Sequence, residues 1–218
     1  MKTITVLGTG VVGQTIANKL ILLGYHVVMG SRTADNAKGL AWVEVAGNNA
    51  RLAAFADAVL ASHIVFNCTK GALSAEILSS IGADQFAGKI VIDLANPLDF
   101  SVGFPPTLTL SNTDSLGETL QRNLPNAHIV KALNTMNCNI MVNPNLVANG
   151  DHDVFICGND AAAKTEVAVI LEAFGWQKQH IRDLGDITAS RGLEQYLPFW
   201  AVVMKHIGHA SFQTKIVQ

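Results

Sequence analysis

A glycine-rich segment near the start of the chain is the pattern best suited to chemistry. Gly8, Gly10 and Gly13 form a Gly-x-Gly-x-x-Gly motif. The first glycine permits a tight turn, the second lets a diphosphate approach the backbone, and the third lets a helix pack closely on a strand. The following helix N-terminus favours an anion. The motif, with Thr9, Val11 and Val12 between its glycines, predicts a dinucleotide site, and a tight turn without a nucleotide is the alternative.

The residues about 20 positions further on indicate which dinucleotide is bound. Proteins that prefer NAD place an acidic residue there, and it bonds the ribose 2′-hydroxyl. This chain has Ser31, Arg32 and Thr33 instead. A guanidinium and two hydroxyl groups suit a 2′-phosphate, so the sequence predicts NADP(H) rather than NAD(H). Lys38 adds a further cation if it turns toward this site, although a solvated helix-surface lysine is the simpler interpretation.

Three further groups of candidate residues directly follow predicted strands. In doubly wound sheets the ligand lies across the carboxyl ends of the strands, so these residues are expected to share one edge of the sheet. An ordinary turn or a backbone cap is the alternative for each group. The three groups are Cys68, Thr69 and Lys70; Ala95, Asn96 and Pro97; and Asn134.

The sequence shows no pattern typical of hydrolysis or of a metal centre. It has no His-Glu-x-x-His helix and no Ser-His-Asp order. His206 and His209 are three residues apart, but no third ligand lies nearby, so no metal is expected. Hydride transfer between two bound rings requires proximity rather than a protein acid. We therefore expect no catalytic side chain.

Strand-like and helix-like segments alternate along the chain, as in βαβ units. The prediction is an α/β fold of Rossmann type, with a doubly wound, mainly parallel sheet over residues 1–185 and a helical appendage over 186–218 that closes the second-substrate cleft. Residues 100–110 are expected to form a loop, and the helical pattern over 187–212 is expected to break at Pro198. Strands are expected at 4–7, 26–29, 64–68, 90–93, 128–133 and 153–157, and helices at 12–23, 33–47, 55–58, 72–81, 115–123 and 161–174.

Composition narrows the class of partner. Hydrophobic residues make up 49% of the 218-residue chain and charged residues 15%, which is typical of strands covered on both faces. The net charge of -2 disfavours nucleic acid as a partner. No apolar run approaches the length of a membrane span, and we expect no leader before the first predicted strand. A cytoplasmic location without membrane contact is the expectation.

Four blocks occur in order: Gly-Thr-Gly-Val-Val-Gly, Val-Met-Gly-Ser-Arg, Asp-Leu-Ala-Asn-Pro and Val-Lys-Ala-Leu-Asn-Thr. In these blocks the chain resembles the coenzyme F420-dependent NADP oxidoreductase family and the reductase domain of the STEAP metalloreductases. The resemblance implies a homodimer with Ser31 and Arg32 on the 2′-phosphate of NADPH. It also implies nicotinamide contacts from Thr69, Asn96, Pro97 and Asn134, and a second-carrier cleft at Asn134, Thr135, Met136 and Pro198.

Three functions are consistent with these residues. The first hypothesis is hydride transfer between NADPH and a small-molecule redox carrier, which could be the deazaflavin F420 or a flavin such as FMN or FAD. An NADPH-dependent dehydrogenase or reductase of a small substrate is the second. A non-catalytic NADP(H)-sensing protein is the third, because a dinucleotide-binding fold does not by itself establish catalysis.

Overall fold

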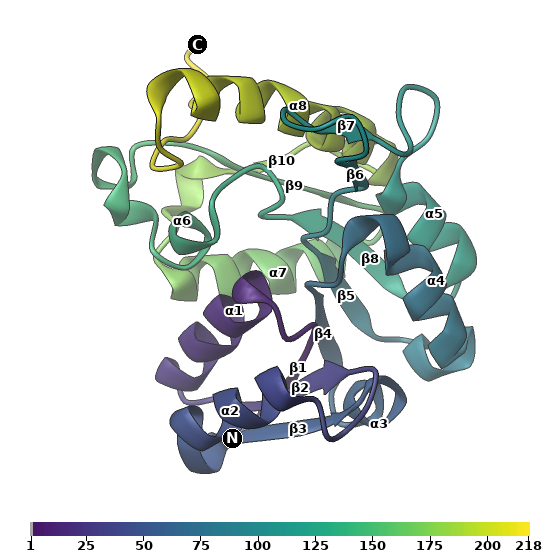
Figure 1. Cartoon of the computed structure of the whole chain (residues 1–218). Coiled ribbons are helices and arrows are strands. Elements are labelled where there is room, and N and C mark those ends of the chain that lie inside the picture. The colour runs from purple at the N-terminus through teal and green to yellow at the C-terminus, as the bar shows by residue number, and fades with distance from the viewer. Residues whose placement is uncertain (1) are drawn as a thin grey trace.

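The computed structural model describes residues 2–218, and its central feature is an eight-stranded sheet in the order β10-β9-β8-β5-β4-β1-β2-β3 (Figure 1). All neighbouring pairs are parallel except β8 and β9, which are antiparallel. This arrangement confirms the predicted Rossmann-type, mainly parallel sheet. The strands are β1 (Thr3–Leu7), β2 (His26–Ser31), β3 (Ala50–Ala54), β4 (Ile64–Asn67), β5 (Ile90–Asp93), β8 (His128–Ala132), β9 (Val154–Gly158) and β10 (Ile181–Asp183).

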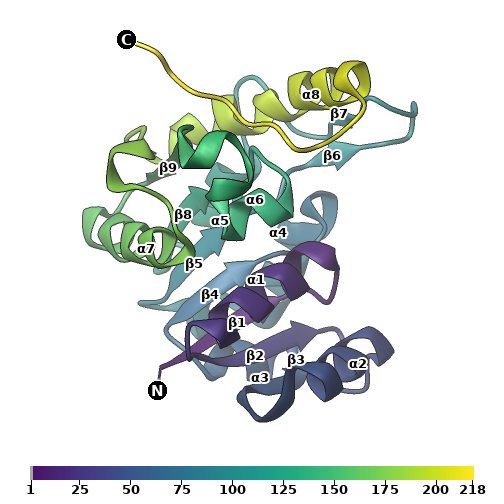
Figure 2. The ribbon, with the colours of Figure 1, turned by 90° about the vertical axis from the view of Figure 1, so that its left-hand side faces the viewer.

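Helices cover both faces of this sheet (Figure 2). A separate hydrophobic cluster lies between the sheet and the helices on each face. One cluster, which contains Ile16, Phe66 and Phe174, packs α1 (Val11–Leu22), α2 (Ala37–Ala46), α6 (Cys138–Val142) and α7 (Ala161–Phe174) on the strands. The other, which contains Leu7 and Leu120, packs α3 (Phe55–Leu60), α4 (Gly71–Ile81) and α5 (Leu116–Asn123). Burial on both faces accounts for the continuous apolar runs of the strands.

Two strands of the sheet and a small hairpin were not predicted. The β3 sequence Ala-Arg-Leu-Ala-Ala has low strand propensity, and its pairing with β2 stabilises the extended form. β10 has only three residues. β6 (Leu98–Asp99), just before the predicted loop, and β7 (Thr107–Leu108), within it, form an antiparallel pair. All these segments are too short or too weakly patterned for sequence periodicity to reveal them.

The predicted helix break at Pro198 is wrong. α8 (Ser190–Ile207) runs through the proline and ends at Gly208, which has a left-handed conformation. A proline removes one helical hydrogen bond. The buried face of α8 continues on both sides of it, at Leu193, Leu197 and Ala201, so packing offsets that loss. The predicted start at Thr33 of the second helix is also wrong, because Asn36 caps α2 and accepts a hydrogen bond from Gly39.

The segment after α8 runs back alongside that helix, as Figure 2 shows. The Asp153 N–H donates to the Thr214 carbonyl oxygen at 3.0 Å. The fully buried Asp153 carboxylate accepts from the Ile216 amide at 2.8 Å, from His180 Nδ1 at 3.0 Å and from Arg182 Nε at 3.2 Å. Since β9 is antiparallel to β8, Asp153 lies at the edge where the parallel strands end. Residues 209–218 are therefore anchored at that edge.

The bonds of the buried Asp153 carboxylate make the free energy of unfolding depend on pH. Burial alone would raise the pKa of the Asp153 carboxyl, but the bonds from Ile216, His180 and Arg182 hold that pKa below its ordinary value. The stabilisation is therefore complete above the unfolded pKa of about 4 and is lost as the pH falls through the lower folded pKa. Denaturant unfolding should show Asp153→Asn less stable than the wild type by about 1–2 kcal/mol at pH 7, with the difference shrinking below about pH 4. A difference that stays constant down to pH 2 would contradict this account.

Candidate functional site

The glycine loop joins β1 to α1 at the carboxyl edge of the sheet. Gly8 has φ +118°, and a Cβ there would lie 2.6 Å from the Cys68 carbonyl oxygen. A Cβ on Gly13 would lie 2.0 Å from the Gly8 carbonyl oxygen. Only glycine fits at these two positions. Gly10 is the N-cap of α1 and supplies no side-chain cap, so the first-turn N–H groups of the helix remain available to an anion.

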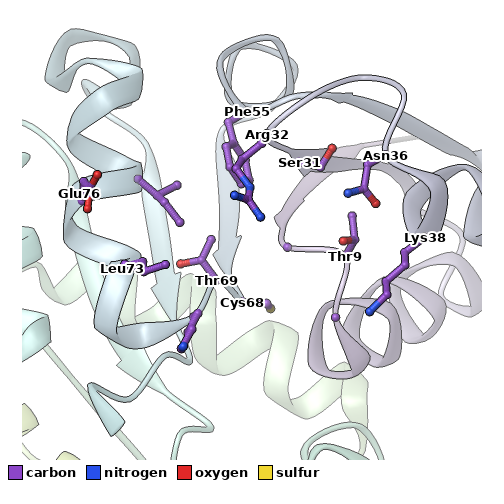
Figure 3. Close-up of a pocket in the computed structure, with 14 residues that line it drawn as sticks. Thr9, Ser31, Arg32, Asn36, Lys38, Phe55, Cys68, Thr69, Leu73 and Glu76 are labelled. Carbon is purple, nitrogen blue, oxygen red and sulfur yellow. The ribbon is translucent and has the colours of Figure 1, made fainter. Parts of the chain in front are cut away.

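Beside this loop lies a cavity of about 580 Å³ (Figure 3). It is lined by Gly8, Thr9 and Gly10 from the loop, by Ser31 and Arg32 from the end of β2, and by Cys68, Thr69 and Lys70 after β4. The structure thus brings three of the predicted groups together around one cavity. Thr33 is exposed and is not among the lining residues, and Val11 is 74% exposed on the first turn of α1.

The cavity also has lining residues that were not among the predicted site residues, and Lys38, for which a solvated helix surface was the simpler interpretation, is one of them. Asn36 and Lys38 come from the start of α2, and Figure 3 shows the Lys38 side chain directed toward the loop that carries Thr9. Phe55 and Leu73 contribute apolar surface from α3 and α4. Phe55 was missed because it follows β3, the strand that the sequence pattern does not reveal. The cavity therefore combines cationic groups for phosphates with apolar surface for a flat ring.

Asn96 and Asn134 form a reciprocal pair at the ends of β5 and β8. Asn96 Nδ2 donates to the Asn134 carbonyl oxygen at 2.9 Å, and Asn134 Nδ2 donates to Asn96 Oδ1 at 2.8 Å and to the Leu193 carbonyl oxygen at 3.1 Å. Asn134 Oδ1 is buried and has no partner among residues 2–218. Leu133 has φ +62°, an unfavourable conformation for a bulky residue, and such strain often occurs at functional sites.

The residues predicted for the second cleft lie near this pair but do not line the cavity. Thr135 and Met136 are buried, and Pro198 is half-buried in α8. Asn96, Ala95, Pro97 and Asn134 are likewise absent from the cavity wall. The structure thus places the candidates in two adjacent groups, of which one surrounds an open cavity and the other is packed.

The cysteine at the cavity wall is not poised to react. Burial raises the pKa of the Cys68 thiol well above its usual range, and the Asp93 carboxylate raises it further. Burial likewise raises the pKa of Cys157 to about 12. Both side chains are therefore protonated thiols at neutral pH and are poor nucleophiles. They fill space between the strands and helices.

Residues 2–218 contain no group of three or more His, Cys, Asp or Glu side chains arranged to hold a metal ion. Within the same residues, no helix is both long and apolar enough to cross a membrane. The site therefore consists of a phosphate-compatible loop, a cationic rim and a pair of amides.

The glycine geometry predicts different outcomes for two neighbouring substitutions. Gly13→Ala forces a Cβ against the Gly8 backbone, so unfolding should become easier by about 2–3 kcal/mol. Gly10→Ala introduces a Cβ that meets no atom within 4 Å, and its φ of -77° suits alanine, so the melting temperature should stay close to that of the wild type. Thermal unfolding of both variants makes the comparison. Equal melting temperatures would show that the loop does not have this geometry.

Comparison with known proteins shows which family the chain is similar to. A sequence model of the family described as NADP oxidoreductase, coenzyme F420-dependent, matches residues 3–97. Among proteins of known sequence, rat metalloreductase STEAP3 is 29% identical over 90% of the chain, and the F420-dependent NADP reductase of Methanocaldococcus jannaschii is 30% identical over 53% of it. The chain spans 37% and 50% of the lengths of these two relatives.

Solved structures extend the similarity to the whole chain. A protein of Arthrobacter sp. FB24, described as a candidate F420-dependent NADP reductase, is 48% identical, superposes with a TM-score of 0.93, and each chain covers 100% of the other. An imine reductase of Streptomyces aurantiacus is 20% identical with a TM-score of 0.66, and that similarity concerns the fold alone. This chain covers 64% of the imine reductase.

Proposed function

The chain belongs to the F420-dependent NADP oxidoreductase family and is therefore an NADP-dependent oxidoreductase, and on this premise we propose that it transfers hydride between NADP(H) and a deazaflavin or flavin carrier. The main support for the proposal is the cavity between the uncapped N-terminus of α1 and two cations, Arg32 directly after β2 and Lys38 on α2. Diphosphate and 2′-phosphate groups match these two features.

The residues present fit NADP(H). Gly10 and the first turn of α1 are open to a diphosphate, and Arg32 and Lys38 supply positive charge at the ribose end of the cavity. The buried Asn134 Oδ1 lacks a donor, and the carboxamide N–H of a nicotinamide is a donor of the required kind. We assign Gly8, Thr9, Gly10, Ser31 and Arg32 to the diphosphate and 2′-phosphate, and Thr69, Asn96, Pro97 and Asn134 to the nicotinamide side.

In this mechanism the protein positions the rings and supplies no acid or base. When bound, NADPH would supply a hydride, two electrons with a proton, from its nicotinamide C4 atom to the carrier and would leave as NADP⁺. The Asn96–Asn134 pair orients the carboxamide. The packed residues around Asn134 and Pro198 exclude water from the space beside it. Proximity of the two rings then accounts for the rate.

The second carrier, a deazaflavin or a flavin, needs a place to stack beside the nicotinamide. A flat ring stacked beside the nicotinamide would contact residues 134–136 and α8 near Pro198. Thr135 and Met136 are buried and Pro198 is half-buried, so side chains there would have to move to admit the carrier. The same packing favours the second candidate function, an NADP(H)-sensing protein that accepts no carrier.

A calorimetric titration separates these functions. NADPH should bind more tightly than NADH, and F420, FMN or FAD should then bind to the NADPH complex. Binding of NADPH with no binding of any carrier would favour the sensor, whereas binding of neither nucleotide would refute the proposal. Light scattering of the same sample tests the homodimer that the family resemblance implies, by the expected mass of two chains.

Arg32 provides a direct test of NADP(H) preference. Arg32→Asp places a negative charge where the 2′-phosphate is proposed to bind, so affinity for NADPH should fall by roughly 100-fold while affinity for NADH stays the same or rises. The matched control is Arg51→Asp, which changes an exposed arginine at the other end of the neighbouring strand β3. An unchanged NADPH affinity in Arg32→Asp would mean that the 2′-phosphate binds elsewhere.

A further inference from the structure

Three buried ionisable side chains bond or adjoin the neighbours of the Asn96–Asn134 pair and have no role in the function proposed above. Lys131 on β8, Asp93 at the end of β5 and Glu194 on α8 are each at most 1% exposed. Lys131 Nζ lies 2.7 Å from Asp93 Oδ2 and 2.7 Å from Glu194 Oε1. We refer to these three side chains as the Lys131 cluster.

The ammonium group of Lys131 is fully bonded. In addition to the two carboxylates, it donates to the Ala95 carbonyl oxygen at 2.5 Å, so each of its three donors has an acceptor. Burial alone would lower the pKa of Lys131, but the two carboxylates beside it hold that pKa above its ordinary value. Lys131 is therefore charged.

Both carboxylates of the cluster are surrounded by donors alone. Asp93 Oδ1 accepts from Asn67 Nδ2 at 2.7 Å and from the Ala95 amide at 3.1 Å. The Glu194 oxygens accept from the backbone amides of Leu116 and Gly117, at the N-terminus of α5, at 2.8 and 3.0 Å. A protonated carboxyl would have no acceptor for its proton in these contacts, so the geometry fits the ionised forms. One cation and two anions give the cluster a net charge of -1.

The cluster adjoins the residues assigned to the nicotinamide. Lys131 and Asp93 bond the carbonyl and the amide of Ala95, the residue before Asn96. Asn134 Nδ2 donates to the carbonyl of Leu193, the residue before Glu194. The net negative charge is thus separated from the Asn96–Asn134 amides by single residues of backbone.

We propose that the Lys131 cluster sets the redox balance of the bound nicotinamide by favouring its oxidised, cationic ring. The inference rests on the proposed function, because it requires NADP(H) to bind with its nicotinamide at this pair. NADP⁺ and NADPH carry the same phosphates and differ by one positive charge on the ring. A fixed negative charge in a poorly solvated site therefore stabilises NADP⁺ relative to NADPH, which makes bound NADPH a stronger hydride donor. The positive end of the α5 dipole offsets only part of that charge.

The test compares the dissociation constants of both nucleotides in Glu194→Gln. This variant keeps the size of the side chain and removes one negative charge. The ratio of the NADP⁺ constant to the NADPH constant should rise by roughly 3- to 10-fold over the wild type. A tenfold rise corresponds to a potential of the bound two-electron couple about 30 mV more positive. Fluorescence or calorimetric titration measures both constants without any carrier.

Glu118→Gln is the matched control. Glu118 also joins α5 to α8, through Arg191, but Arg191 is partly exposed and the pair lies outside the cluster. In Glu118→Gln the ratio of the NADP⁺ constant to the NADPH constant should stay within about twofold of the wild type, because solvent screens the lost charge. If circular dichroism shows that Glu194→Gln does not fold, Asp93→Asn removes the same charge and carries the same expectation.

Two outcomes would overturn the inference. A Glu194→Gln variant that binds both nucleotides with the wild-type ratio, whether more weakly or not, would show that the cluster is purely structural. A wild type that binds neither NADP⁺ nor NADPH would refute the proposed function itself, and the inference with it. A raised ratio in Glu194→Gln with an unchanged ratio in Glu118→Gln would support it.

Discussion

The buried ammonium group of Lys131 joins β8 to β5, to the turn after β5 and to α8. A lysine without solvent contact is stable only if carboxylates and carbonyls surround it, and here they come from β5, from the turn after β5 and from α8. Glu194 in turn satisfies the first amides of α5. Removal of one partner from such a group usually costs several kcal/mol. The C-terminal helix is therefore joined to the sheet by charge as well as by its apolar face, directly behind the candidate site.

The same interaction connects the two groups of site residues. Asp93 also bonds Asn67, and Asn67 Oδ1 accepts from the Thr69 hydroxyl at 2.7 Å on the cavity wall. A continuous set of hydrogen bonds thus runs from the cavity, through the sheet edge, to α8. Leu133, next to Asn134, has a strained backbone, and Gly71 approaches the Asn96 carbonyl so closely that a Cβ there would lie 1.8 Å from its oxygen. Rigid neighbours of this kind hold two amides in position without the flexibility of a long loop.

The parts of the fold and site that the sequence predicts are those with local causes. The glycine loop, Ser31 and Arg32 follow from a motif of about 25 residues, and the buried central strands follow from their apolar runs. β3 was missed because its propensity is low and pairing with β2 stabilises it, and the position of Phe55 was missed with it. The partners of Lys131 are 38 and 63 residues away in the sequence, so no local pattern reveals them. The sequence likewise does not reveal that α8 continues through Pro198, because that depends on the residues against which its buried face packs.

The proposed reaction requires that NADPH bound in this cavity give its C4 hydrogen to a second flat ring. A single-turnover experiment with NADPH that carries deuterium at the transferred C4 position, mixed with the protein and F420 or a flavin, tests it most directly. We expect NADPH to be oxidised as the carrier is reduced, at a rate slowed by the deuterium, and the label to appear in the reduced deazaflavin. No oxidation of bound NADPH by any of these carriers would contradict it.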